Sequence, residues 1–287
     1  MKEPNGKRGL VLEGGAMRGL FTAGVLDTLM EHSLYPDGMI GVSAGAAFGC
    51  NLKSGQKGRV LRYNKRFCKD PRYCSWRSLL FTGDLFGADF CYRRLPDELD
   101  IFDKDTFNSS PMDFYMVCTD VQNGEAIYKK CNIADEKCYD WMRASASMPL
   151  VSRPVNIDGK YYLDGAISDA IPLKYFESEG YSKNIVVLTQ ESTYRKKPQK
   201  GMFLIRHFLR KYPALIQKLA SRHLVYNDTL DYIRKQSANG SILLIQPEKP
   251  LPVDRLCHDP ALLQATYDAG KDAAEKLLPQ IRLFLQK

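Results

Sequence analysis

The first half of the chain alternates short apolar runs with stretches that have the periodicity of a helix. Residues 8–13 read as a buried strand, and Gly14 and Gly15 end it. Large apolar side chains within 19–31 then repeat at helical spacing, and a second apolar strand follows at 39–42. This order of strand, helix and strand predicts an α/β fold.

The remainder of the chain continues the alternation. We expect strands at 114–119, 126–128, 160–163, 185–189 and 242–246, and helices at 138–147 and 260–285. The turn 122–124 (Gln-Asn-Gly) joins the first two of these strands into a hairpin, and 57–110 reads as short helices and loops. Alternating strands and helices imply a mostly parallel sheet that is covered on both faces.

Composition narrows the class of protein. With 44% hydrophobic and 26% charged residues, the chain is an ordinary globular sequence and not a disordered one. Its apolar runs are far shorter than the ~20 residues of a membrane span, and the polar start 1–9 has no apolar signal segment. The eight cysteines include no C-x-x-C pair, which favours reduced thiols. We therefore expect a cytoplasmic protein.

The net charge of +8 is concentrated in two stretches. Residues 51–80 hold nine Lys or Arg and only Asp70, and residues 192–227 hold nine Lys or Arg and no acidic residue. Each stretch is either a solvated basic face or a surface that meets phosphate in nucleic acid, anionic lipid or a charged substrate. No nucleic-acid reader motif accompanies the charge, so we expect no nucleic-acid partner.

Within the second stretch, residues 202–219 form a basic amphipathic pattern that is interrupted near Pro213. Such a segment either lies in a membrane interface or docks its apolar side on the protein's own core. The sequence leaves both readings open, with the basic segment 195–222 as the expected contact to an anionic membrane.

The first chemical motif is Gly41-Val42-Ser43-Ala44-Gly45, which places a serine between a strand and a helix. Glycines two residues before and two residues after the serine permit a tight turn that exposes the hydroxyl. The helix that follows directs its N-terminal N–H groups toward developing negative charge. An ordinary glycine-rich turn is the alternative.

A second loop between strand and helix contains Gly14, Gly15, Ala16, Met17, Arg18 and Gly19. A dinucleotide-binding loop is disfavoured, because Ala16 occupies the place of the second glycine and Asp37 is the only acid at the right distance. Backbone N–H groups in this loop, with Arg18 nearby, instead suit an oxyanion hole. A helix-start turn is the simplest alternative.

The base that would activate Ser43 is less obvious. The chain has four histidines, of which only His258 keeps a Ser–Asp–His order open. The alternative is Asp164, which ends the strand 160–163 and is followed by the small residues Gly165 and Ala166. An ordinary Asp-Gly turn is the competing reading of that position.

Taken together, these three motifs resemble the patatin-like phospholipase family, whose members carry a glycine-rich loop, then G-x-S-x-G, then Asp-Gly-Ala/Gly. The stretch 144–149 (Ala-Ser-Ala-Ser-Met-Pro) is also similar to a helix end that members carry before the aspartate. The resemblance implies a three-layer α/β/α sandwich over about 8–190. It leaves a mostly helical extension at 200–287, packed on that domain, with the boundary near 191–201.

By that resemblance the enzyme is a serine lipid acyl hydrolase of the phospholipase A or lysophospholipase type. Ser43 is the nucleophile, Asp164 is the base of a Ser–Asp dyad, the loop 14–19 binds the oxyanion, and no metal or organic cofactor is needed. Members usually carry Gly where Ala16 stands, which strains the loop if that position requires positive φ. The alternative function is a catalytically weak lipid-binding or regulatory protein on the same scaffold.

Overall fold

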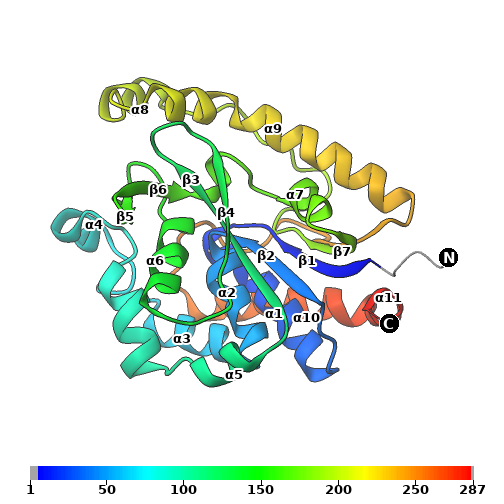
Figure 1. Cartoon of the computed structure of the whole chain (residues 1–287). Coiled ribbons are helices and arrows are strands. Elements are labelled where there is room, and N and C mark those ends of the chain that lie inside the picture. The colour runs from blue at the N-terminus through cyan, green and yellow to red at the C-terminus, as the bar shows by residue number, and fades with distance from the viewer. Residues whose placement is uncertain (1–5, 286–287) are drawn as a thin grey trace.

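The computed structural model describes residues 6–285, and a mixed sheet of eight strands runs through its centre (Figure 1). The strands are β1 (Lys7–Leu12), β2 (Gly38–Val42), β3 (Asp113–Asp120), β4 (Ala126–Lys130), β5 (Val155–Ile157), β6 (Lys160–Asp164), β7 (Tyr181–Val187) and β8 (Ile242–Ile245). Five of them lie parallel in the order β3, β2, β1, β7, β8, and β4, β5 and β6 are antiparallel additions on the β3 side. The expected strands are present within four residues of their predicted bounds, and β5 is an additional one.

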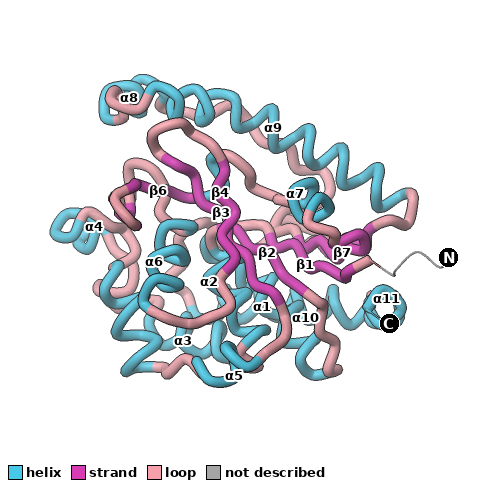
Figure 2. Tube along the Cα trace, viewed as in Figure 1, coloured by secondary structure: helices cyan, strands magenta, loops and turns pink. Residues whose placement is uncertain are grey.

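Helices cover both faces of the sheet (Figures 1 and 2). The helices are α1 (Gly19–Glu31), α2 (Ala44–Lys53), α3 (Arg59–Phe67), α4 (Trp76–Thr82), α5 (Lys104–Ser109), α6 (Glu136–Ser145), α7 (Leu173–Ser178), α8 (Met202–Phe208), α9 (Pro213–Ala238), α10 (Pro260–Lys276) and α11 (Leu278–Leu285). Two 3₁₀ turns, η1 (Ala16–Arg18) and η3 (Gly165–Ile167), and a π-helix, η2 (Phe90–Leu99), complete the elements. Helices α1, α2, α6, α10 and α11 pack on one face, and α7 and α9 pack on the other. The three-layer α/β/α architecture is therefore confirmed.

The two helical layers follow from the side-chain alternation of the strands. In β1, Leu10 and Leu12 join the core beneath α1 and α2, whereas Val11 between them joins the core beneath α7 and α9. All three side chains are fully buried. A strand that is apolar on both faces is what a central position in a parallel sheet requires.

Strand β3 brings two distant parts of the chain end to end. Val117 pairs with Val42 of β2 on one edge and with β4 on the other. The next residue, Cys118, also pairs with β4, and on the edge that β2 occupies it pairs with Asp164 of β6. Strands β2 and β6 thus share one edge of β3 and run toward each other. The residues that follow β2 and end β6 meet there.

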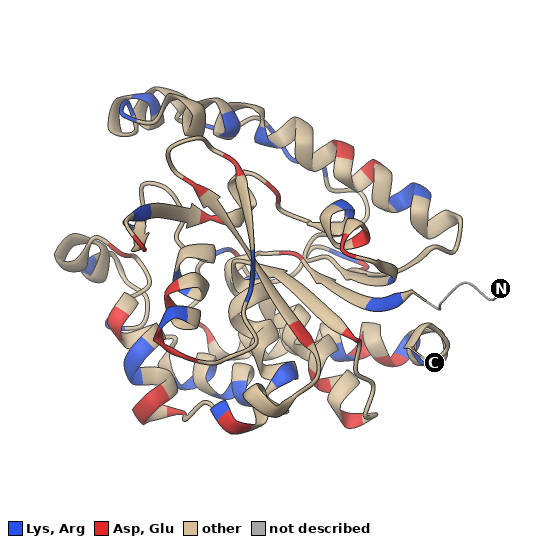
Figure 3. Ribbon diagram, viewed as in Figure 1, with Lys and Arg blue, Asp and Glu red and all other residues tan. Residues whose placement is uncertain are grey.

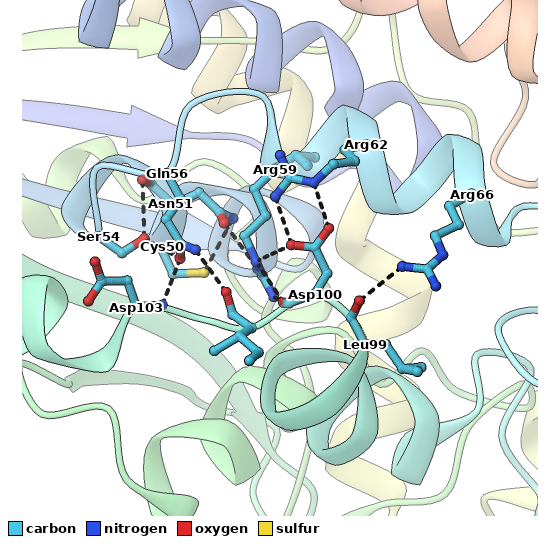
Figure 4. Close-up of polar contacts among 12 residues, drawn as sticks. Cys50, Asn51, Ser54, Gln56, Arg59, Arg62, Arg66, Leu99, Asp100 and Asp103 are labelled. Carbon is cyan, nitrogen blue, oxygen red and sulfur yellow. Dashed lines mark hydrogen bonds and ion pairs between the residues drawn. The ribbon is translucent and has the colours of Figure 1, made fainter.

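Three arginines of the first basic stretch form hydrogen bonds to the end of η2 and to Asp100 (Figure 4). Arg62 donates from Nε and Nη2 to the Asp100 carboxylate at 2.8 Å each. Arg59, whose side chain is buried, donates from Nε to the Asp100 carbonyl at 3.0 Å, and Arg66 reaches a carbonyl at the end of η2 at 3.0 Å. These arginines hold η2 against α3.

The C-terminal part of the chain is integrated into the same fold. Strand β8 extends the parallel sheet beside β7, and α10 packs along α1. The Tyr267 hydroxyl of α10 donates to the buried carboxylate of Asp27 in α1 at 2.6 Å. The helical stretch expected at 260–285 is divided into α10 and α11 at Leu277. The domain boundary near 191–201 stays a prediction.

Part of the amphipathic segment 202–219 docks on the protein's own core, and part of its apolar side stays exposed. Ile205, Leu215 and Leu219 are buried in a small core with η3 and the end of β6. Phe203 and Phe208 of α8, by contrast, are 73% and 66% exposed. Helix α8 therefore keeps an apolar surface that the protein itself does not cover.

All eight cysteines lie among the described residues, where each is a free thiol, and all but Cys91 are buried. Within residues 6–285, no helix has the length and apolar character needed to cross a membrane.

Candidate active site

Ser43 occupies the sharp turn between β2 and α2, where the G-x-S-x-G spacing predicts it. Its backbone has φ 56° and ψ −122°, a conformation that costs a non-glycine residue on the order of 1–3 kcal/mol. A Cβ at Gly45 would lie 2.5 Å from the carbonyl oxygen of Leu12, and one at Gly41 would lie 2.5 Å from that of Gly45. Side chains at either glycine would therefore force the turn open.

A buried serine of α6 stabilises this strained turn. Ser145 is fully buried, its Oγ accepts the backbone N–H of Ser43 at 3.0 Å, and its hydroxyl donates to the Val117 carbonyl at 2.7 Å. The stretch 144–149, which contributes to the family resemblance, thus contains a residue that contacts the serine turn directly.

Asp164 lies against Ser43, as expected from the meeting of β2 and β6. Ser43 and Asp164 line the same small cavity, the Ser43 hydroxyl is among the groups that act on the pKa of the Asp164 carboxyl, and the two residues are only 8% and 3% exposed. The N–H of Ala166 donates to Oδ1 of that carboxyl at 2.8 Å. Gly165, which lies between Asp164 and Ala166 in the sequence, begins η3 and packs against the Val117 carbonyl. The structure therefore brings the predicted serine, aspartate and Asp-Gly-Ala motif together.

Burial raises the pKa of the Asp164 carboxyl above its usual range. The Ala166 N–H, the positive charge of Arg222, the Ser43 hydroxyl and the charge of Arg255 offset part of that rise. A carboxylate of raised basicity beside a serine hydroxyl is the combination that general-base catalysis requires.

The glycine-rich loop passes directly over the serine turn. A Cβ at Gly14 would lie 2.8 Å from Ser43 Cβ and 2.8 Å from the Val42 carbonyl oxygen, so any side chain there would displace the serine. Gly15 packs against Thr189 at the end of the β7 region. Ala16 has φ 50°, a left-handed conformation that favours glycine.

Only part of the loop 14–19 has N–H groups available to a ligand. The N–H of Met17 donates to the Arg255 carbonyl at 3.5 Å, that of Arg18 donates to the Gly15 carbonyl, and that of Gly19 donates back into η1. Gly14, Gly15 and Ala16 have N–H groups without a partner within residues 6–285. Of the loop 14–19, which the sequence predicts as the oxyanion hole, these three residues are the ones that can donate an N–H group to an oxyanion.

The four histidines lie elsewhere. The ring of His258 hydrogen-bonds through Nδ1 to the Cys68 carbonyl, and His32 pairs with Glu275. His207 stacks edge-on with Phe208 of α8, and His223 lies in α9. None of them lines a cavity at Ser43 in the described part of the chain.

Two cavities meet at Ser43. The larger one, of about 290 Å³, is lined mostly by apolar side chains, among them Phe48, Tyr63, Tyr73, Trp76, Leu85, Leu95, Phe102 and Met142. The smaller one, of about 40 Å³, lies between the loop 14–16, Asp164 and α9, and its lining contains several charged side chains beside apolar ones. Ser43 and Ala16 line both cavities. In residues 6–285, no group of three or more His, Cys, Asp or Glu is arranged to hold a metal ion.

Some residues around the smaller cavity were not singled out from the sequence. Glu13 is buried and accepts hydrogen bonds from Thr189 N at 2.7 Å and from the Tyr226 hydroxyl at 2.5 Å. Lys196 and Arg222 also line the cavity. Their basic segment is evident from the charge pattern, but no spacing rule shows which of its nine cations turns inward.

Comparison with known proteins places the chain in a family. The model of the patatin-like phospholipases matches residues 10–177, and a model described as a domain of unknown function (DUF6363) matches residues 212–286. The uncharacterized protein YjjU of Escherichia coli (strain K12) is 30% identical over 275 residues, which cover 93% of this chain and 75% of that protein. The probable lipid hydrolase 463L of invertebrate iridescent virus 6 is 22% identical over 214 residues, covering 68% of this chain and 74% of that one.

Among solved structures, VipD from Legionella pneumophila matches with a TM-score of 0.46 and 13% identity, over 96% of this chain and 67% of that one.

The patatin-like match covers more than half of the chain and contains the serine turn, the glycine-rich loop and Asp164. The similarity to YjjU extends over nearly the whole length. The resemblance inferred from the three motifs is therefore confirmed: the chain belongs to the patatin-like phospholipase family, and at the level of that family it is a lipid acyl hydrolase.

Proposed function

We propose that the protein hydrolyses carboxylic esters of phospholipids or related acyl lipids through a dyad of Ser43 and Asp164. The observation that carries this proposal is the position of Ser43 beside the buried Asp164 carboxyl, with both residues lining one small charged cavity that meets an apolar cavity at Ser43. The viral relative described as a probable lipid hydrolase supports the same chemistry.

In the proposed acylation step, Ser43 Oγ attacks the ester carbonyl carbon while its proton passes to the Asp164 carboxylate. The tetrahedral intermediate then collapses, the bond to the alcohol breaks, and the departing alkoxide oxygen takes the proton from Asp164. Water attacks the acyl-Ser43 ester in the second half of the reaction and gives a proton to Asp164. Collapse frees the carboxylic acid and returns the proton to Ser43 Oγ.

The N–H groups without a partner are suited to the negative oxygen of the tetrahedral intermediate. Gly15 and Ala16 supply them from the loop beside Ser43, and Ala44, the first residue of α2, has a further one within the described chain. Loss of one such donor typically costs about 3–4 kcal/mol of transition-state stabilisation.

The larger cavity suits the acyl chain. It is apolar, it begins at Ser43, and its volume of about 290 Å³ lies near the lower end of the range for small-molecule sites. Trp76 of α4 lines the cavity and is itself 69% exposed, so the cavity reaches the protein surface beside α4. This arrangement supports the proposal of a phospholipase A or lysophospholipase activity.

Contact with a lipid surface is the second part of the proposal. Helix α8 exposes Phe203, Leu204 and Phe208, and Arg206, Arg210 and Lys211 are exposed beside them. Figure 3 shows Lys and Arg positions on α8, and in Figure 1 α8 lies on the same side of the view as α4, which exposes Leu80 and Phe81. Exposed aromatic side chains among cations suit an anionic membrane surface.

The dyad is tested by labelling the protein with a fluorophosphonate probe and by measuring turnover of a short-chain soluble ester. Wild type should label, and Ser43→Ala should not. Asp164→Asn should lower turnover at least 100-fold, because a positioned general base contributes 10²–10⁴-fold. Ser168→Ala, which removes a hydroxyl bonded to Thr119 near Asp164, is the matched control. A folded wild type that neither labels nor turns over would favour the lipid-binding alternative.

Membrane contact is tested by flotation with vesicles that contain anionic or only zwitterionic lipid. Binding to anionic vesicles should fall in the double variant Phe203→Glu/Phe208→Glu. It should persist in Leu283→Glu, where an equally exposed side chain of α11 is changed. Equal binding by all three proteins would contradict this part of the proposal.

A further inference from the structure

The small cavity beside Ser43 collects positive charge from four separate segments. Arg18 comes from η1, Lys196 from the segment before α8, Arg222 from α9, and Arg255 from the loop after β8. Three of these four residues come after β7 in the sequence. The cavity is therefore built jointly by the glycine-rich loop and the C-terminal part of the chain.

Within the described part of the chain, these four cations form no ion pair. In residues 6–285, none of the four side chains lies within ion-pair or hydrogen-bond distance of a carboxylate, although the protein forms such pairs elsewhere. The ammonium group of Lys196 lies instead over the Tyr226 ring, 4.1 Å from its centroid. The Nε atoms of Arg18 and Arg222 are buried and have no hydrogen-bond partner among the residues that the structure describes.

The two carboxylates at the cavity do not balance the four cations. Glu13 is already engaged by Thr189 and Tyr226, and Asp164 accepts the N–H of Ala166 beside Ser43. With both ionised, the lining still carries a formal excess of two positive charges. Burial together with Arg222 lowers the pKa of Lys196 to about 7, which is the expected response of a crowded cation.

An uncompensated, partly buried cluster of this kind is costly unless an anion satisfies it. Arginine guanidinium groups match the oxygens of a phosphate particularly well. The volume of about 40 Å³ is room for roughly three oxygen-sized groups, since one water needs ~10–15 Å³. The cavity adjoins the apolar one, because Ala16, Ser43, Met148 and Arg255 line both.

We propose that Arg18, Lys196, Arg222 and Arg255 form an anion subsite that takes a phosphate group during the reaction. This inference rests on the proposed function. It narrows the substrate to acyl esters that carry a phosphate close to the scissile ester, with the acyl chain in the apolar cavity. The C-terminal part of the chain would then determine head-group preference.

Turnover of a matched pair of substrates tests the subsite. The pair is a monoacylglycerol phosphate and the corresponding neutral monoacylglycerol, both in the same nonionic detergent. Wild type should hydrolyse the phosphate ester with a kcat/KM at least tenfold higher. Arg222→Gln should reduce that preference at least tenfold, mainly through KM. Lys235→Gln, which changes an exposed cation on the same helix α9, should keep it. An unchanged preference in a folded Arg222→Gln would overturn the subsite.

A binding measurement separates this inference from the proposed catalysis. Calorimetry with Ser43→Ala should detect glycerol phosphate, and the additional change Arg222→Gln or Arg255→Gln should abolish the signal. That result would support the subsite even if no ester were turned over. Inorganic phosphate serves as the second probe. If it binds equally well and wild type shows no preference for phosphate esters, the site takes free phosphate and the substrate assignment is overturned.

Discussion

Replacement of Ala16 by glycine should stabilise the protein slightly, although glycine usually destabilises. Ala16 has φ 50°, and the left-handed conformation costs an L-residue about 1–2 kcal/mol that glycine does not incur. Against this gain, glycine widens the unfolded ensemble at a cost of about 0.4–1 kcal/mol. Loss of the half-buried methyl group of Ala16 destabilises the glycine variant by about 0.4 kcal/mol more. At the middle of these ranges the net change is a stabilisation of about 0.4 kcal/mol.

The same substitution at Ala23 is the matched control. Ala23 lies inside α1 and is 1% exposed, so glycine there loses about 1 kcal/mol of helix propensity and about 0.8 kcal/mol of methyl burial. The two variants should therefore differ by about 2 kcal/mol in the free energy of unfolding. In thermal unfolding that difference corresponds to about 3 °C in Tm for a chain of 287 residues. If Ala16→Gly proves as destabilised as Ala23→Gly, the strain attributed to the loop is absent.

Three further outcomes are expected. As the pH is lowered, turnover of a soluble ester should decline at a higher pH than the pKa of an exposed aspartate, because burial raises the pKa of Asp164 and the base works only when ionised. A decline in the usual pKa range of aspartate would count against Asp164 as the base. Ser145→Ala should cost about 1–3 kcal/mol in urea unfolding and lower turnover, because it leaves the N–H of Ser43 without its partner. Arg59→Ala should cost about 3 kcal/mol, because the carboxylate of Asp100 is buried, whereas Arg62→Ala should cost less than about 1 kcal/mol, because that side chain is 56% exposed; equal costs would refute the distinction.

Local patterns carried most of the information about individual elements. The strand before Ser43 and the helix after it are evident because apolar period and small-residue spacing depend only on near neighbours in the chain. Helix α1 was expected with the bounds that it has. The short strand β5 was missed, because Val155–Ile157 offers only three residues and one exposed position between two buried ones.

The sequence by itself determined the motifs, their order and the family, since each motif is a run of a few residues whose local chemistry is legible. What it could not determine is which distant residues share a site. The pairing of β2 and β6 on one edge of β3 decides that Asp164 meets Ser43, and the packing of α9 decides that Arg222 faces the same cavity. Such contacts depend on strand register and helix packing, which are set by the whole core and leave no periodic signal in the chain.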